Sequence, residues 1–293
     1  MTICLKGGRV IDPANGLDKV VDIYINDGII AGVGRAPTGM PVDTSYDVSG
    51  KYVMPGLVDL GAHLREPGFE HKGNISSELK AAVAGGFTTV CCTPDTRPVI
   101  DNGSVVEHIR QRANRERSAR VFCLGALTAN LEGKVLAEMA ALKESGCIAV
   151  TNLNQAISDT SVLRHALAYA ASCELKVLLH PYEHWLNRGG EMHEGQLSTL
   201  LGVPGIPEAA ELIALQRDLI LVEETGVDAH FCRLSCGKSV QLVAAAKRRG
   251  LSVTADAAAA NLLFSENDIK GFDSQFRVTP PIRSKKDLSL LRN

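Results

Sequence analysis

Short apolar runs alternate with amphipathic stretches along most of the chain. Apolar runs of strand length occupy seven windows, at residues 53–58, 88–92, 121–124, 147–150, 176–180, 229–234 and 252–255. Helical spacing of apolar residues lies between them, at residues 105–117, 135–144, 161–172, 209–224 and 239–249. The clearest helical period is that of Leu212, Leu215, Leu219 and Val222. Strands that alternate with helices predict βα units around a parallel sheet, and therefore an α/β fold.

The number of predicted strands bears on how the sheet can close. A (β/α)8 barrel of the TIM type needs eight strands, and seven are visible before the chain stops at Asn293. An open barrel has two edges with unpaired backbone groups, which invite aggregation. We therefore expect residues 53–293 to form a (β/α) barrel that lacks its C-terminal part, and the natural protein to be longer. The alternative is a gene product that ends at this residue.

Residues 1–52 follow a different pattern. Turn signals at Gly7-Gly8, at residues 13–16 and at residues 26–28 separate short segments. Residues 20–26 alternate roughly as a strand does. A small N-terminal β-domain is therefore predicted ahead of the barrel.

Composition narrows the class of protein. The 293 residues are 45% hydrophobic with a net charge of −2, which allows a large core and argues against nucleic acid as a partner. No stretch reaches the roughly 18 apolar residues of a membrane span, and residues 1–6 do not resemble a signal peptide. The eight cysteines are scattered, and several lie in apolar runs where a reduced thiol acts as a small hydrophobe. We expect a cytoplasmic protein with reduced cysteines.

The most informative segment is Asp-Leu-Gly-Ala-His-Leu-Arg at residues 59–65. Side chains at positions i and i+2 of a strand point to the same face, so a strand that ends His-x-His can aim two imidazoles at one metal ion. Here the two positions are Gly61 and His63. Because glycine offers no ligand atom, such a site would lose a metal bond at its first position.

Several further motifs accompany this segment. They are Val-Met-Pro-Gly-Leu-Val-Asp at residues 53–59, His-Leu-Arg-Glu-Pro-Gly at 63–68, Lys72, residues 78–90, Thr-Pro-Asp-Thr at 93–96, residues 205–217, and Val-Thr-Pro-Pro-Ile-Arg at 278–283. In combination they resemble a dihydroorotase, a cyclic amidohydrolase of the amidohydrolase superfamily, over essentially the full chain. The resemblance implies a (β/α)8 barrel, a small β-domain, and catalytic residues at the carboxyl ends of the strands.

The resemblance also implies a metal site of six ligands. The family takes two histidines from strand one, a bridging acidic ligand from strand four, one histidine each from strands five and six, and an aspartate from strand eight. His63 and His180 stand at two of these positions, whereas Gly61 replaces the other histidine of strand one. The strand that would carry the aspartate is not visible in this chain.

Strands four and six have lost their ligands as well. The family's acidic position aligns near Asn152-Leu153, and an asparagine cannot bridge two cations as a carboxylate does. Arg233 replaces the histidine of strand six and is a fixed cation without a lone pair to give. Two of six ligands remain, whereas a catalytic zinc needs about three protein ligands and a water. We therefore expect no metal, no other cofactor and no catalytic residue, because nothing would activate the nucleophile.

Other histidines and cysteines give weaker signals. His180 and His184 match the H-x-x-E-H pattern of some zinc proteases, but that pattern works on a helix, whereas here Pro181 follows a strand-like run. The remaining candidates are expected to be solvated or structural: His193 with Glu191 and Glu194 in a solvated loop, His230 at the start of a strand, and Cys232 and Cys236 as buried reduced thiols.

Two positions bear on substrate binding. Arg65 matches the arginine with which the family binds a carboxylate. Asp95 stands where the family has an asparagine, and its negative charge disfavours an anionic substrate. We expect Arg65 to pair with Asp95 rather than to bind a ligand.

Within the family, the chain is most similar to the catalytically silent dihydroorotase-like subunit that assembles with aspartate carbamoyltransferase in some bacteria. The resemblance implies a structural subunit in pyrimidine biosynthesis, a homo-oligomer within a large hetero-oligomer whose partner is the aspartate carbamoyltransferase catalytic subunit. Two alternatives remain open: an active zinc-dependent dihydroorotase or cyclic amidohydrolase with substitute ligands, and a small-molecule sensor that uses the empty cavity.

Overall fold

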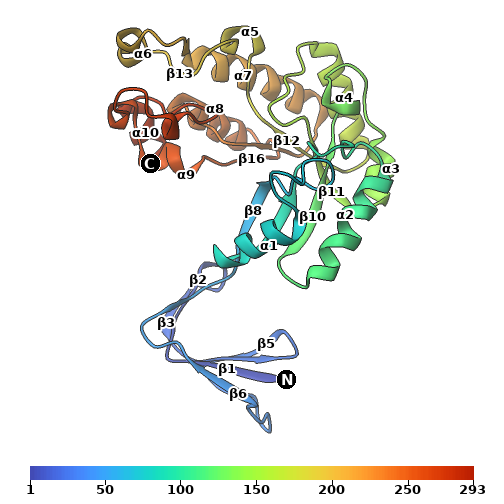
Figure 1. Ribbon diagram of the computed structural model, residues 1–293, viewed down its shortest axis with the longest axis vertical. Coiled ribbons are helices and arrows are strands. Elements are labelled where there is room, and N and C mark those ends of the chain that lie inside the picture. The colour runs from blue at the N-terminus through green and yellow to red at the C-terminus, as the bar shows by residue number, and fades with distance from the viewer. The chain divides into compact units, whose positions relative to one another are not determined.

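The computed structural model describes residues 1–293, which divide into two compact units, Met1–Leu57 and Val58–Asn293 (Figure 1). The division falls later than residue 52 because strand β7 (Tyr52–Val53) pairs with β2 (Arg9–Asp12) of the first unit. No helix in either unit is long and apolar enough to cross a lipid bilayer.

The first unit is built from two small β-sheets. One has the strand order β5-β4-β1-β6, with bounds Ile29–Val33, Ile23–Asn26, Thr2–Lys6 and Thr44–Asp47. The other has the order β3-β2-β7, where β3 is Leu17–Val20 and the short 3-10 helix η1 (Pro13–Asn15) links β2 to β3. Asp27 and Gly28 have φ values of 47° and 81°, as a tight turn between the hairpin strands β4 and β5 requires.

The second unit holds a seven-stranded sheet in the order β16-β15-β12-β11-β10-β9-β8, so each strand lies beside the sheet strand that follows it along the chain. The bounds are β8 Leu57–Ala62, β9 Phe87–Cys92, β10 Arg120–Ala126, β11 Cys147–Thr151, β12 Lys176–Leu179, β15 Ala229–Phe231 and β16 Val253–Ala255. The pairings from β9 through β16 are parallel. The prediction of an α/β fold with a TIM-type barrel sheet is confirmed.

Helices connect the strands. The main ones are α1 (Ile75–Ala84), α2 (Gly103–Glu116), α3 (Met139–Glu144), α4 (Thr160–Ser172), α7 (Glu208–Thr225) and α8 (Gly237–Arg248). The shorter elements are η2 (Ala129–Leu131), α5 (His184–Asn187), the strand pair β13 (Met192–His193) and β14 (Gly205–Ile206), α6 (Gln196–Leu201), α9 (Ala259–Leu263), η3 (Glu266–Asp268), η4 (Ser274–Phe276) and α10 (Lys285–Arg292). Asn74 caps α1 by accepting the Ser77 N–H.

Strand β8 differs from its prediction in position and in burial. The apolar run at residues 53–58 was expected to be a buried strand, but β8 begins only after Pro55 and Gly56, which interrupt β-pairing. Its side chains are exposed, with Leu57 at 42% and Val58 at 54%. Among the strands of the structure, β8 pairs with β9 alone.

Alternation along the strands separates two apolar layers. Leu79, Ile109, Leu167 and Leu215 of the helices pack with one face of the sheet, together with strand residues such as Val177. The opposite face carries a separate buried cluster of Cys91, Leu124, Ala149, Leu178 and Cys232, which fills the inside of the curved sheet. Because strand side chains alternate between the two faces, the residues two positions after this inner cluster lie on the same face, at the carboxyl ends of the strands.

Candidate functional site

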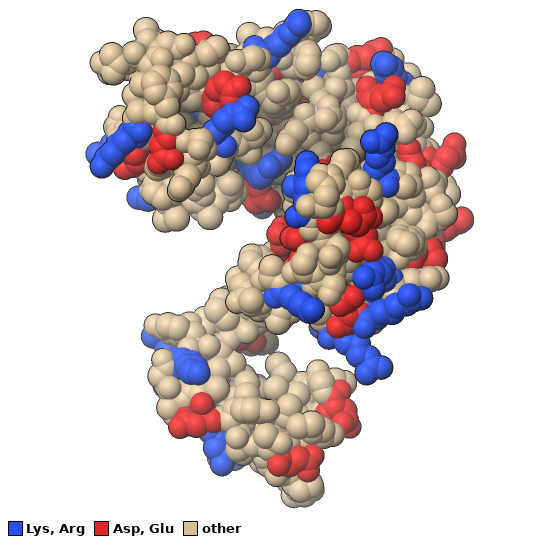
Figure 2. All heavy atoms as spheres, in the orientation of Figure 1, with Lys and Arg blue, Asp and Glu red and all other residues tan.

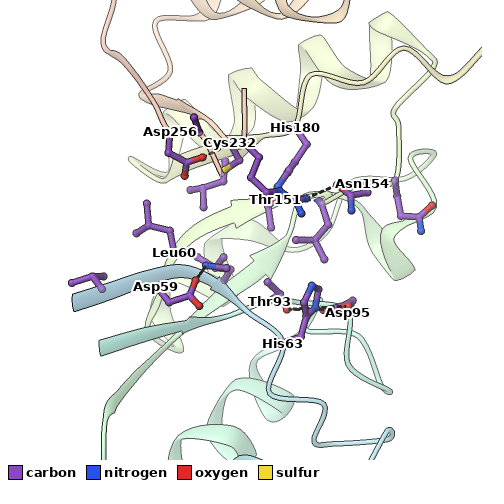
Figure 3. Close-up of a pocket in the computed structure, with 18 of the residues that line it drawn as sticks. Asp59, Leu60, His63, Thr93, Asp95, Thr151, Asn154, His180, Cys232 and Asp256 are labelled. Atoms are coloured by element: carbon purple, nitrogen blue, oxygen red, sulfur yellow. Dashed lines mark hydrogen bonds and ion pairs between the residues drawn. The ribbon is translucent and has the colours of Figure 1, made fainter. Parts of the chain in front are cut away.

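A cavity of about 580 Å³ opens at the carboxyl ends of the strands of the second unit. Thr93, Thr151 and His180 line it, each two residues beyond a member of the inner apolar cluster. Figure 3 shows two groups of polar side chains in this cavity, one with His63, Thr93 and Asp95 and the other with His180, Cys232 and Asp256. The fold therefore places polar chemistry where a barrel of this type carries its active site.

His63, Thr93 and Asp95 form a hydrogen-bonded group. His63 Nδ1 lies 2.9 Å from Asp95 Oδ2 and 3.0 Å from Thr93 Oγ1, and the Thr93 hydroxyl donates to Asp95 Oδ1 at 2.6 Å. Burial alone would raise the pKa of Asp95, but the hydrogen bonds from His63 and Thr93 outweigh it and lower that pKa. Gly61 lines the same cavity, where a Cβ atom would meet only Thr93 Cγ2 at 3.9 Å, so the position has room for a side chain that it lacks.

The expected pairing of Arg65 with Asp95 is wrong. The ion-pair partner of Asp95 is His63, and Arg65 takes part in no ion pair. The backbone of Arg65 has a φ of 65°, in the left-handed region, and its side chain lines a neighbouring cavity of about 620 Å³ together with Lys72 and Glu78. Arg65 is therefore directed to a different recess from the one that Asp95 lines.

At strand four, the structure separates the two residues near which the acidic ligand was expected. Leu153 lines the cavity, whereas Asn152 is buried behind it and does not. The Asn152 side chain accepts a hydrogen bond from the Thr128 hydroxyl at 2.6 Å and donates to the Gln155 carbonyl at 2.9 Å. Asn152 thus fixes the loop after β11, and the loop residues that line the cavity, Leu153, Asn154 and Gln155, include no carboxylate.

His180 directly follows strand β12 and lines the cavity. Burial is the main cause that lowers the pKa of His180 to about 3, and the positive charge of Arg233 is the second. The imidazole is therefore neutral at physiological pH. Its Nδ1 atom is buried without a hydrogen-bond partner. His184 belongs to the separate short helix α5, so the H-x-x-E-H residues do not share one helix face.

Arg233 lines the cavity and reaches two loops. Its NH2 group donates to Asn154 Oδ1 at 2.6 Å and its NH1 group to the Thr279 carbonyl at 3.3 Å. No carboxylate pairs with the Arg233 guanidinium, whereas its backbone N–H donates to Asp256 Oδ1. A permanent cation, bound by neutral oxygens, therefore stands where the family resemblance implies a histidine.

A group that the sequence did not predict lies beside Arg233. His230 Nε2 is 3.0 Å from Asp256 Oδ2, and its Nδ1 is hydrogen-bonded to Thr254 Oγ1 at 2.7 Å. His230 was placed at the strand end away from the active face; instead it contacts Asp256, which lines the cavity, because β15 is only three residues long. Burial alone would raise the pKa of Asp256, but the His230 and Arg233 hydrogen bonds lower it. The sequence feature that could have predicted a polar group here is Asp256, a carboxylate that directly follows the apolar run at residues 252–255.

The two cysteines of this region are buried, as expected. Burial raises the pKa of Cys232 to about 12, and it lines the cavity. Cys236 lies away from the cavity, next to the carboxylate of Glu211. Both are thiols in the structure, and all eight cysteines are free.

His193 also differs from its expectation. It was expected in a solvated loop, but it lies on β13 and is only 6% exposed. Its Nδ1 is 3.3 Å from an NH1 group of Arg283, a buried arginine that also donates to the Ile206 carbonyl at 2.7 Å. Glu191 instead pairs with Arg277 at the surface. His193 is thus part of a buried polar cluster that fixes the C-terminal segment.

The residues at the expected ligand positions do not fit the family's metal site. His63 keeps Nε2 available and His180 is neutral, but the structure brings neither of them together with two further metal-binding side chains. Gly61, Leu153 and Arg233 provide no metal-binding atom. The cavity therefore lies where the family binds its metal pair, but strands one, four, five and six do not provide the ligand atoms that such a pair needs.

Fold and site together define a barrel of the amidohydrolase type. L-hydantoinase (dihydropyrimidinase) from Arthrobacter aurescens superimposes with a TM-score of 0.83 at 20% identity, over 99% of this chain and 65% of its own. The family model "Dihydro-orotase-like" matches residues 50–239. The chain belongs to the dihydroorotase-like family.

Individual relatives agree with this assignment. A "Dihydroorotase-like protein" of Pseudomonas putida is 47% identical over all of this chain and 69% of its own length, and one of Pseudomonas aeruginosa is 45% identical over the same shares. A "Dihydroorotase" of Trichlorobacter lovleyi is 39% identical, again over 100% and 69%. The chain spans about two thirds of the length of these relatives and 65% of the hydantoinase chain.

Proposed function

We propose that this chain is a dihydroorotase homologue without dihydroorotase activity, which acts as a structural subunit in an assembly with the aspartate carbamoyltransferase catalytic subunit. The observation that carries the proposal is the lining of the cavity, where Gly61, Leu153 and Arg233 stand at positions that would need metal-binding atoms. Without a metal at these positions, the site loses the means by which the family would lower the pKa of a water to about 7 and so provide a nucleophile for a cyclic amide.

The partner in this proposal comes from the resemblance of the motifs to a silent subunit of the same family. The two Pseudomonas relatives, which share 47% and 45% identity with this chain, are named dihydroorotase-like rather than dihydroorotase. The eight free cysteines support a reducing compartment such as the cytoplasm, where pyrimidine synthesis would take place. Figure 2 shows acidic and basic side chains interspersed on the face in view, so charge gives little steering and a partner would be recognised through apolar contacts.

Co-expression tests the assembly. The aspartate carbamoyltransferase catalytic subunit of the same host is expressed with and without the natural full-length form of this protein, and the mass and activity of the product are measured. We expect a large complex that contains both chains and is lost when this protein is omitted. The Gly61→His/Arg233→His variant serves as a matched control, because a structural role should not depend on the cavity. A transcarbamoylase that is equally large and active alone, with no co-elution, would refute the proposal.

A second candidate is an active metal-dependent cyclic amidohydrolase. It is favoured by the name "Dihydroorotase" that several relatives at 39–41% identity carry, and by the Asp256 carboxylate in the cavity. Turnover of dihydroorotate or carbamoyl aspartate by the unmodified protein, abolished by chelation and restored by zinc, would support this candidate.

A further inference from the structure

One set of metal-binding atoms in the cavity region lies outside the positions that the family resemblance implies. His230 on β15, Cys232 directly after β15 and Asp256 directly after β16 each offer one ligand atom, and the three atoms lie within 4.8 Å of one another. We propose that His230, Cys232 and Asp256 bind one Zn²⁺ ion. Such a site is additional to the proposed structural function and does not depend on it.

The donors suit zinc. Nitrogen, thiolate sulfur and carboxylate oxygen are its common protein ligands, with bonds of about 2.0–2.3 Å. In a tetrahedral site the donor atoms are therefore roughly 3–4 Å apart. His230 Nε2 and Asp256 Oδ2 are already 3.0 Å apart, and the thiol of Cys232 lies within 4.8 Å of both. The sulfur has to approach by roughly an ångström at most to complete the set.

Neighbouring groups hold two of the three ligands in place. The hydrogen bond of 2.7 Å between His230 Nδ1 and Thr254 Oγ1 fixes the imidazole and leaves Nε2 directed at Asp256. The second oxygen of Asp256 accepts the Arg233 backbone N–H. Metal sites use such outer contacts to orient their ligands. The positively charged Arg233 guanidinium donates to Asn154 and to the Thr279 carbonyl, so its hydrogen bonds are made to these groups and not to the three proposed zinc ligands.

The proposed ion would also have an open side. Cys232 and Asp256 line the cavity of about 580 Å³, so a water or another small ligand can reach the fourth position. The protein ligands come from β15 and β16, which pair through Ala229 with Val253 and Phe231 with Ala255. A bound zinc would therefore link the last two strands of the sheet and stabilise them against separation.

Metal binding to the natural full-length protein tests the site without any activity assay. Metal-free, reduced protein is titrated with Zn²⁺ and, separately, with Co²⁺, whose charge-transfer absorption reports a bound thiolate. We expect about one zinc per chain and a cobalt–thiolate band. Cys232→Ser and Asp256→Asn should weaken zinc binding at least ~10-fold, and Cys232→Ser should abolish the band.

Two matched variants distinguish this site from the other thiols and histidines of the same region. Cys91→Ser changes another buried cysteine of the same inner cluster, and His63→Ala removes a histidine at a family ligand position. Both should keep the affinity and the band of the unmodified protein. The melting temperature of the metal-free proteins shows that each variant is folded, and zinc should raise it in every protein except those altered at Cys232 or Asp256. No zinc uptake by the unmodified protein, equal uptake after Cys232→Ser, or loss after His63→Ala would overturn the inference.

Discussion

Glu211 of helix α7 holds the start of helix α8, and replacing it should destabilise the protein strongly. The residue is 4% exposed, and its carboxylate accepts the backbone N–H groups of Ser235 at 3.1 Å and Cys236 at 3.0 Å. It also accepts the hydroxyl of Ser239 at 2.6 Å and that of Ser235. Cys236 is the N-cap of α8 and makes no side-chain cap, so Glu211 supplies from another helix the acceptor that the cap lacks.

The magnitude follows from the groups that would be left without a partner. Glu211→Ala leaves buried N–H and O–H donors unpaired, each of which costs about 1–3 kcal/mol. It also removes the carboxylate that lies 4.0 Å from the guanidinium of Arg283, itself 3% exposed. Breaking a buried charge pair costs about 3–5 kcal/mol. These contributions overlap, so we expect a total loss of about 3–5 kcal/mol for Glu211→Ala. Glu211→Gln keeps one acceptor oxygen and should lose roughly half as much.

Urea unfolding followed by circular dichroism measures the effect, and Glu224→Ala is the matched control. Glu224 lies on the same helix and pairs with Arg164 at 2.6 Å, but the two side chains are 46% and 50% exposed. Such a surface pair contributes less than about 1 kcal/mol. Hydrogen exchange should in addition show faster exchange at the first turn of α8 after Glu211→Ala only. If the two alanine variants unfold at the same urea concentration, the capping role assigned to Glu211 is wrong.

Three further predictions concern titration and the cavity. Asp218 is buried, and burial, partly offset by Arg217, raises its pKa from 3.8 to about 6. The folded protein therefore holds a proton that the unfolded chain releases, so the free energy of unfolding should fall by ~2 kcal/mol as pH rises from 4 to 6. Asp218→Asn should remove this fall in pH-dependent melts. The unmodified protein should show no dihydroorotase turnover in either direction by a coupled absorbance assay, and Gly61→His/Arg233→His should not restore it, because Leu153 still offers no bridging carboxylate. Elemental analysis should show the same metal content with and without His63→Ala. A drop in the variant would show that His63 binds a metal, which contradicts our reading that the family's ligand positions hold none.

Periodicity predicted most of the elements of the second unit. Residues 147–150 and 209–224 correspond closely to β11 (Cys147–Thr151) and α7 (Glu208–Thr225). These predictions succeed because apolar spacing reports which face of an element is buried, and that depends on local sequence. The run at residues 53–58 failed because Pro55 and Gly56 moved the strand onward, and because exposure at a sheet edge depends on neighbours rather than on the strand itself.

The sequence by itself determined the order of strands and helices, the family, and the absence of ligand atoms at Gly61 and Arg233, since these follow from residue type and spacing. Only the tertiary structure decided that Asp95 pairs with His63 and that His230 meets Asp256. Strand alternation fixes the face on which a side chain lies, but which two side chains meet depends on the register between strands and on the path of the connecting loops. Those are properties of the assembled sheet, because no single segment of the chain contains both partners.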